Sequence, residues 1–129
     1  MRVLLDTNVF LWLHAEPERL GSRLAVLEDP ATERLISAVV GWEIAIKHGL
    51  GRLHLPEPPE RWVPSRIHRG AMVALPIELA HVLGVASLEH HHRDPFDRLL
   101  ISTARSLKVP IVTADPVFAR YDVEVLGLH

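Results

Sequence analysis

The stretch Val3-Leu4-Leu5-Asp6-Thr7-Asn8-Val9-Phe10 places two different hydrophobic patterns next to each other near the start of the chain. Residues 3–5 form a short, continuous apolar run, which is typical of a buried strand. Residues 7–14 have apolar side chains at helical spacing, which predicts a helix. Asp6 separates the two patterns. We therefore expect this carboxylate at the carboxyl end of a buried strand, directly before a helix.

The same alternation of strand and helix patterns continues along the chain. Further strands are expected at 34–38, 71–75, 110–113 and 123–126, and further helices at 21–29, 39–48, 61–69, 78–88 and 95–107, with a short helical turn at 116–121. This order predicts an α/β fold with a central, mostly parallel sheet of about four or five short strands, flanked by helices. In such folds the functional site forms outside the carboxyl ends of the strands.

Length and composition limit the classes of protein that the sequence can belong to. The chain has 129 residues, which predicts a single domain over 1–129. The absence of cysteine excludes disulfides, thiolate metal sites and cysteine nucleophiles. The longest apolar runs have five residues, so we expect no membrane helix. An acid at position 6 comes too early for a signal peptide, and we expect a cytoplasmic protein.

Four acidic residues fall where a charged side chain is costly. Asp6 and Asp115 each follow an expected strand, and Glu43 and Asp97 lie on the core-facing sides of two expected helices. A buried, unpaired carboxylate costs several kcal/mol, so four of them need a common compensation. A divalent cation supplies it. Carboxylates without cysteine suit Mg²⁺ or Mn²⁺.

Each of these acids also has an ordinary structural explanation. Asp6 could cap the helix that follows it. Glu43 could form a solvent-facing ion pair with Lys47, four residues later. Asp97 could favour the helix dipole in the first turn, and Asp115 could start a turn before a proline. One shared site explains all four positions together, whereas the alternatives require four separate coincidences.

The histidine run and the tryptophans are weaker indicators of metal binding and of exposed contacts than the four acids are of a shared site. The run 90–92 consists of three histidines, which cannot all face one point in regular structure, so we expect a solvated loop rather than a Zn²⁺ or Ni²⁺ site. We expect Trp12 and Trp42 in the core. Trp62 lies in a proline-rich segment among charged residues, and we expect it to be an exposed contact.

Four motifs, taken in order, resemble a known family. They are Asp6-Thr7-Asn8, the segment WEIAIK at 42–47, the segment HRDPFDRLL at 92–100, and Thr113-Ala114-Asp115. This set resembles a PIN domain, and more closely the VapC-type toxins of bacterial toxin–antitoxin pairs. The likeness runs from residue 1 to about residue 126. The ordered combination is specific, although Asp-Thr-Asn alone is a weak signal.

The resemblance implies an endoribonuclease that depends on Mg²⁺ or Mn²⁺ and leaves 5′-phosphate and 3′-hydroxyl ends. Its catalytic and metal-binding acids map to Asp6, Glu43, Asp97 and Asp115. Other residues lie close to these positions and are candidates for supporting roles: Thr7, Asn8, Asp94 and Thr113 for hydrogen bonding or placing water, and Lys47 and Arg98 for contacts with backbone phosphates. The resemblance also implies a homodimer and a small antitoxin partner whose C-terminal segment lies near the acidic site.

Two alternatives stay open at this point. One is a haloacid-dehalogenase-like Mg²⁺ phosphohydrolase, which also has an aspartate after its first strand. That class needs a second acid two residues later, where this chain has Asn8. The other alternative is a non-catalytic α/β interaction module in which the acids are helix caps and ion-pair partners.

The net charge of −2 excludes a protein that binds RNA by basic charge alone. If the four acids converge on one site, however, removing their charge leaves +2 on the rest of the chain. Bound divalent cations would offset most of the charge of the cluster. We therefore expect RNA binding that weakens when the metal is chelated.

Overall fold

Five parallel strands form one sheet in the order β3-β2-β1-β4-β5, with β1 at its centre. The computed structural model describes residues 1–128. Its strands are β1 (Arg2–Leu5), β2 (Glu33–Ser37), β3 (Val73–Leu75), β4 (Ile111–Val112) and β5 (Val125–Leu126). The predicted α/β class and the parallel sheet are therefore confirmed. The strand expected at 71–75 is shorter because Ala71 has a φ of 51°, which belongs to a turn and not to a strand.

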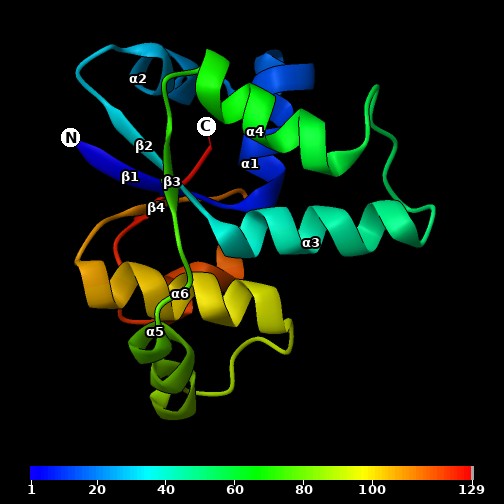
Figure 1. The fold of residues 1–129 in the computed structure, drawn as a ribbon. Coiled ribbons are helices and arrows are strands. Elements are labelled where there is room, and N and C mark those ends of the chain that lie inside the picture. The colour runs from blue at the N-terminus through cyan, green and yellow to red at the C-terminus, as the bar shows by residue number, and fades with distance from the viewer. Residues whose placement is uncertain (129) are drawn as a thin grey trace.

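Helices cover both faces of the sheet (Figure 1). The α-helices are α1 (Thr7–Ala15), α2 (Arg23–Glu28), α3 (Ala38–Gly49), α4 (Pro59–Arg69), α5 (Leu79–Gly84) and α6 (Pro95–Leu107), and the 3₁₀ helices are η1 (Pro17–Leu20), η2 (Val85–Ser87) and η3 (Pro116–Arg120). In Figure 1, α2 and α4 lie above the sheet, and α5 and α6 lie below it. Within residues 1–128, no helix has the length and apolar character needed to cross a membrane.

The centre of the core is β1, where Val3, Leu4 and Leu5 are fully buried. Its apolar run is continuous because helices cover the strand on both faces. Phe10 from α1 and Phe118 from η3 are also fully buried, so the core includes side chains from the two ends of the chain. The other strands and helices therefore pack around β1 and α1, the first two elements of the chain.

The expected positions of two tryptophans are wrong. Trp62 is only 4% exposed, and its ring packs edge-on against Phe10 at 5.9 Å between centroids. Trp42 is 48% exposed on the outer side of α3, where it contacts the ring of Phe96. Proline and charge around Trp62 indicated exposure, but α4 turns its apolar side, including Trp62, toward α1.

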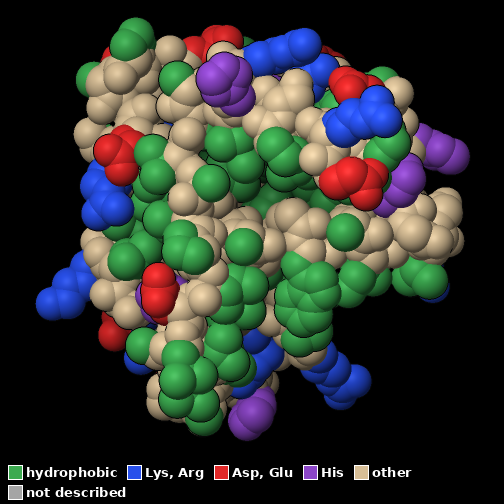
Figure 2. Space-filling view, viewed as in Figure 1, with side chains coloured by type: hydrophobic (Ala, Val, Ile, Leu, Met, Phe, Trp, Pro, Cys, Tyr) green, Lys and Arg blue, Asp and Glu red, His purple; other side chains and the backbone are tan. Residues whose placement is uncertain are grey.

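The apolar side of α5 also faces outward. Leu79, Val82 and Leu83 have the spacing of one helix face, and all three side chains are exposed. The helix expected over 78–88 is divided into α5 and the 3₁₀ turn η2. Figure 2 shows hydrophobic side chains gathered over this lowest part of the molecule. Amphipathic spacing defines which residues share a face, but not whether a neighbour covers it.

Candidate active site

All four acids singled out in the sequence line one small cavity of about 130 Å³. The cavity lies at the carboxyl end of the sheet, between α3 and the first turn of α6. Its lining consists of Asp6, Thr7, Asn8, Glu43, Lys47, Asp94, Asp97 and Asp115. Asp6 follows β1 and Asp115 follows β4, and these two strands are direct neighbours in the sheet. The parallel topology therefore brings together carboxylates that are more than a hundred positions apart in the sequence.

Asp6 is both a helix cap and a member of the acidic cluster. Its Oδ1 accepts a hydrogen bond of 2.9 Å from the backbone N–H of Val9, and its Oδ2 accepts one from the hydroxyl of Thr113. Burial raises the pKa of Asp6 from 3.8 to about 6, against the effect of these bonds, and the charges of Glu43 and Asp115 add to the rise. Asp6 therefore caps α1 and also lines the acidic cavity.

Glu43 is buried in the middle of α3, and its two carboxylate oxygens have different partners. The hydroxyl of Thr7 donates to Oε1 at 2.6 Å, and the ammonium of Lys47 lies 2.5 Å from Oε2. The pair with Lys47 was one alternative for Glu43, and it forms inside the cavity lining rather than on an open surface. The hydrogen bond from Lys47 to Glu43 raises the pKa of the lysine.

Asp97 lies in the first turn of α6, whose cap is Asp94. The Asp94 carboxylate accepts hydrogen bonds from the backbone N–H groups of Phe96 and Asp97, at 2.8 and 3.2 Å. Burial raises the pKa of Asp97 from 3.8 to about 7, with further contributions from the charges of Asp94 and Glu43. A carboxyl group held so close to other carboxylates favours either a proton or a cation.

Asp115 is the most accessible of the four acids, with 35% of its side chain exposed. Its Oδ1 caps η3 by accepting from the N–H of Val117 at 2.9 Å. Its own N–H donates to the hydroxyl of Thr113 at 3.0 Å. Thr113 therefore connects Asp115 to Asp6, which agrees with the supporting role expected for this threonine.

Arg98 is placed differently from the expectation that it contacts phosphate. Its guanidinium does not line the cavity, and it donates to backbone carbonyls, including those of Glu89 at 2.8 Å and His92 at 3.3 Å. These bonds fix the loop that leads into α6. Arg98 therefore supplies a structural contact at this position, and we do not retain it as a phosphate ligand.

His92 is a member of the cluster that the sequence interpretation missed. Its Nε2 lies 2.8 Å from Oδ2 of Asp97 and 3.2 Å from Oδ2 of Asp115. The expectation of a solvated loop holds for exposed His90 but is wrong for His92. One feature of the sequence could have indicated this position. His92 lies two residues before Asp94, the expected cap of the helix at 95–107, and a side chain at such a position can fold back over the first turn of the helix.

The donor set fits a hard divalent cation. Five carboxyl groups surround the cavity, and Lys47 is the cationic side chain in its lining. Ligand atoms of His92, Asp97 and Asp115 all lie within 4.8 Å of one another. Burial is the main cause of the raised pKa values of Asp6 and Asp97, and repulsion between the carboxylates adds to it. A cation among these groups would offset that repulsion. The arrangement can therefore hold a divalent ion and place water beside a bound phosphate.

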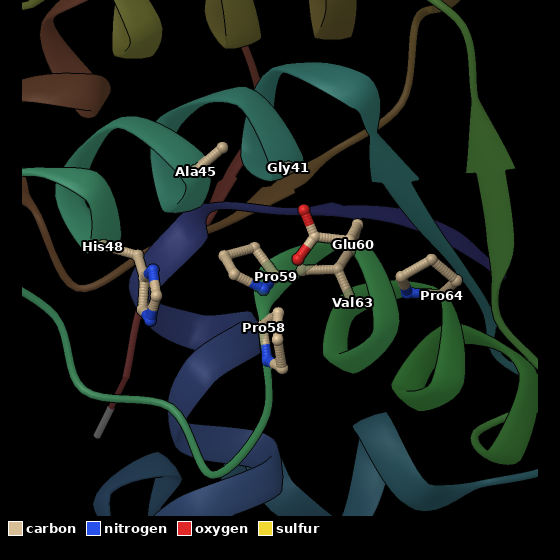
Figure 3. Close-up of a pocket in the computed structure, with 8 residues that line it drawn as sticks. All are labelled: Gly41, Ala45, His48, Pro58, Pro59, Glu60, Val63 and Pro64. Atoms are coloured by element: carbon tan, nitrogen blue, oxygen red, sulfur yellow. The ribbon is translucent and has the colours of Figure 1, made fainter.

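A second, larger cavity of about 480 Å³ lies between α3 and α4 and does not include any of the acids of the cluster. Its lining is mostly apolar and consists of Gly41, Ala45, His48, Pro58, Pro59, Glu60, Val63 and Pro64, as Figure 3 shows. In Figure 2 this region is a hollow with hydrophobic side chains at its floor. Its chemistry suits an apolar partner more than a phosphate.

Comparisons with known proteins agree with this geometry. The PIN domain family model matches residues 3–124. Ribonuclease VapC22 of Mycobacterium tuberculosis is 30% identical over 113 residues, which cover 88% of this chain and 86% of that protein. Ribonuclease VapC16 of the same organism is 40% identical over 57 residues, and this match covers 44% of this chain and only 40% of VapC16.

Solved structures give the same fold. The structure of VapBC2 from Rickettsia felis, bound to a DNA fragment from its promoter, contains a chain that matches with a TM-score of 0.75 at 17% identity, and the match covers 100% of both chains. Similar chains have also been crystallised in toxin–antitoxin complexes. With a family match over nearly the whole chain and an aligned relative of similar length, the chain belongs to the PIN-domain family, within the VapC-type ribonucleases of toxin–antitoxin systems.

Proposed function

We propose that this chain is an endoribonuclease that hydrolyses RNA with Mg²⁺ or Mn²⁺ held by Asp6, Glu43, Asp97 and Asp115. The convergence of these four side chains on one 130 Å³ cavity carries the proposal. The elevated pKa values of Asp6 and Asp97 support it, because burial, and to a smaller extent the charges of neighbouring carboxylates, disfavours the ionised forms that a bound cation would stabilise. As the family resemblance implies, cleavage would leave a 5′-phosphate.

The residues around the cavity have distinct roles in this proposal. When bound, a divalent cation lowers the pKa of a water in its coordination sphere and offsets charge on the phosphoryl oxygens. Thr7 and Thr113 orient the carboxylates of Glu43 and Asp6 through their hydroxyl groups. Asn8 is exposed at the rim and can contact the substrate, and Lys47 provides positive charge for a phosphate while it remains bound to Glu43.

Cleavage of a structured RNA by the purified chain tests this function. We expect cleavage with Mg²⁺ or Mn²⁺ and none with EDTA, and sequencing of the fragments should show 5′-phosphate ends. A generic phosphomonoester serves as the comparison substrate, because a phosphohydrolase of the haloacid-dehalogenase type would hydrolyse it. Turnover of the monoester without cleavage of RNA would contradict the proposal, and so would RNA cleavage that persists in EDTA.

A small antitoxin is the proposed protein partner, with its C-terminal segment beside the acidic cavity. An apolar pocket of about 300 Å³ begins at Asn8, which also lines the acidic cavity, and extends past Trp12 and Leu55. Arg19 lies over the ring of Trp12, 4.1 Å from its centroid, and is ion-paired with Glu16 at 3.1 Å, so this pocket has a polar edge of paired charges. A bound segment that enters this pocket would cover the acidic site. We also propose that both proteins act in the cytoplasm.

A homodimer is proposed through α5 and the edge strand β3. The outward side chains of this surface are apolar and include Val73, Ile77, Leu79, Val82 and Leu83. Contiguous exposed apolar surface on a small protein marks an interaction site. A second copy is the occupant that the family resemblance implies.

Substitution of Leu83 by Glu should therefore give a monomer, because it places a charge within the exposed apolar surface. Leu50→Glu is a matched control, since Leu83 and Leu50 are both 63% exposed and Leu50 lies at the far end of α3. Sedimentation equilibrium should show a dimer for the original chain and for Leu50→Glu. A dimer that survives in Leu83→Glu, or an original chain that is monomeric, would contradict this assignment.

A further inference from the structure

We propose that Nε2 of His92 is a direct ligand of the divalent cation, together with Asp97 and Asp115. The inference rests on the proposed metal-dependent function and deepens it, because it adds a nitrogen donor to a set otherwise made of carboxylates. The nitrogen donor also affects which metal ion the site prefers. A site with an imidazole ligand favours Mn²⁺ over Mg²⁺, because Mg²⁺ prefers oxygen donors more strongly.

The first support is the spacing of the donor atoms. Two ligands at right angles around a cation, each about 2.1 Å from it, are separated by roughly 3 Å. The Nε2 atom of His92 is 2.8 Å from Oδ2 of Asp97 and 3.2 Å from Oδ2 of Asp115. Both separations match neighbouring positions of an octahedral coordination sphere.

The second support is that Nε2 is buried without a hydrogen-bond partner among the described residues. Both nearby carboxylates lie within contact distance, but neither is aligned for a hydrogen bond with the ring nitrogen. A buried polar atom in a folded protein normally has a partner, and an ion or water commonly supplies it where the protein does not. The cation accounts for this atom and for the spacing together.

The third support is that the loop holds His92 in place from several sides. Its backbone N–H donates to the hydroxyl of buried Tyr121 at 2.8 Å, and Arg98 donates to its carbonyl at 3.3 Å. The imidazole ring packs edge-on against Phe118, with centroids 6.1 Å apart. Such contacts fix the direction of a ligand before the cation arrives, as supporting groups around metal sites do.

Metal binding through Nε2 has one structural consequence within the loop. Nε2 must then present its lone pair, so the neutral ring carries its proton on Nδ1. At present, the backbone N–H of Asp94 points to Nδ1 at 3.4 Å, which is long for a hydrogen bond. This weak contact would be lost, whereas the capping bonds of the Asp94 carboxylate would stay.

Pulsed electron paramagnetic resonance of the Mn²⁺-loaded full chain tests the proposal directly. A bound imidazole gives a ¹⁴N coupling to the Mn²⁺ electron spin, and a set made only of carboxylates and water does not. We expect this coupling in the original chain and in His90→Asn, and its loss in His92→Asn. Calorimetry should also show that Mn²⁺ affinity falls at least about tenfold in His92→Asn, while Mg²⁺ affinity changes much less.

His90→Asn is the matched control because it changes the same residue type in the same loop, at an exposed position. Mn²⁺ that binds the original chain without ¹⁴N coupling would overturn the ligand role of His92 and leave the proposed nuclease function standing. Coupling retained in His92→Asn would overturn it as well. An original chain that binds no Mn²⁺ or Mg²⁺ would instead overturn the proposed function. His92→Gln serves as a second variant if His92→Asn does not fold, and the spectrum of the original chain is decisive in either case.

Discussion

Replacement of Asp97 by Asn should reduce RNA cleavage by more than about 100-fold. Changes to groups that only support a metal ligand typically cost 10- to 100-fold in activity or affinity, and loss of a ligand itself should cost more. The amide keeps the size of the side chain but not its charge. The charge of Asp97 is sensitive to its surroundings: its Oδ2 lies beside His92, and burial, with a further contribution from nearby carboxylates, raises its pKa to about 7. Single-turnover cleavage of one RNA at fixed Mg²⁺ concentration measures the effect.

Asp122→Asn provides the control for that experiment. It makes the same chemical change at an exposed position that does not line the acidic cavity. Its cleavage rate should match that of the original chain. If Asp97→Asn retained more than a tenth of the activity, Asp97 could not be a metal ligand in the reaction. Far-UV circular dichroism distinguishes this outcome from a loss of folding.

Stabilisation by Mg²⁺ or Mn²⁺ should be large at pH 8 and small at pH 5. Asp6 and Asp97 have folded-state pKa values of about 6 and about 7, both above the ordinary value of 3.8. A carboxyl group with a raised pKa favours the folded state while it is protonated, and this contribution is lost as the pH rises through the folded-state value. The metal-free protein should therefore lose stability between about pH 4 and pH 7 from these two groups. A cation that binds the ionised carboxylates reverses the loss.

The size of this stabilisation follows from mass action. A cation at 100 times its dissociation constant adds about 2.7 kcal/mol to the free energy of unfolding, provided that it binds only the folded state. For a chain of this length, that corresponds to a rise in melting temperature on the order of 10 °C. Urea unfolding with and without metal, at pH 5 and pH 8, measures both the size and its pH dependence.

The double variant Asp6→Asn with Asp97→Asn separates the site from general ionic effects. It should show no metal-dependent stabilisation, and without metal it should be more stable than the original chain at pH 8, because two carboxylates with raised pKa values are gone. An original chain whose melting temperature is unchanged in millimolar Mg²⁺ and Mn²⁺ would favour the alternative of a non-catalytic interaction module. Equal stabilisation of the double variant would place the bound cation elsewhere.

The acids could be found from the sequence because each one interrupts a local pattern. Asp6 ends a continuous apolar strand, and Glu43 lies on the apolar side of its helix. The alternation of periods then predicts a parallel sheet, and the topology of such a sheet brings the strand ends to one edge. The local hydrophobic pattern and the order of the elements were therefore sufficient to predict the fold class and to identify the four acids of the cluster.

Contacts between distant segments decided the remaining features: the exposure of Trp42 and of α5, the burial of Trp62 and the direction of the His92 side chain. Periodicity reports which side chains share a face, but the element that covers that face comes from elsewhere in the chain, as Phe10 does for Trp62. His92 turns into the cluster because its backbone is bound by Tyr121, 29 residues later. The sequence by itself thus determined the order of strands and helices and the four carboxylates of the cluster. Only the tertiary structure decided which faces are covered and which loop side chain joins the site, because burial and loop direction arise from packing between segments that the local pattern does not relate.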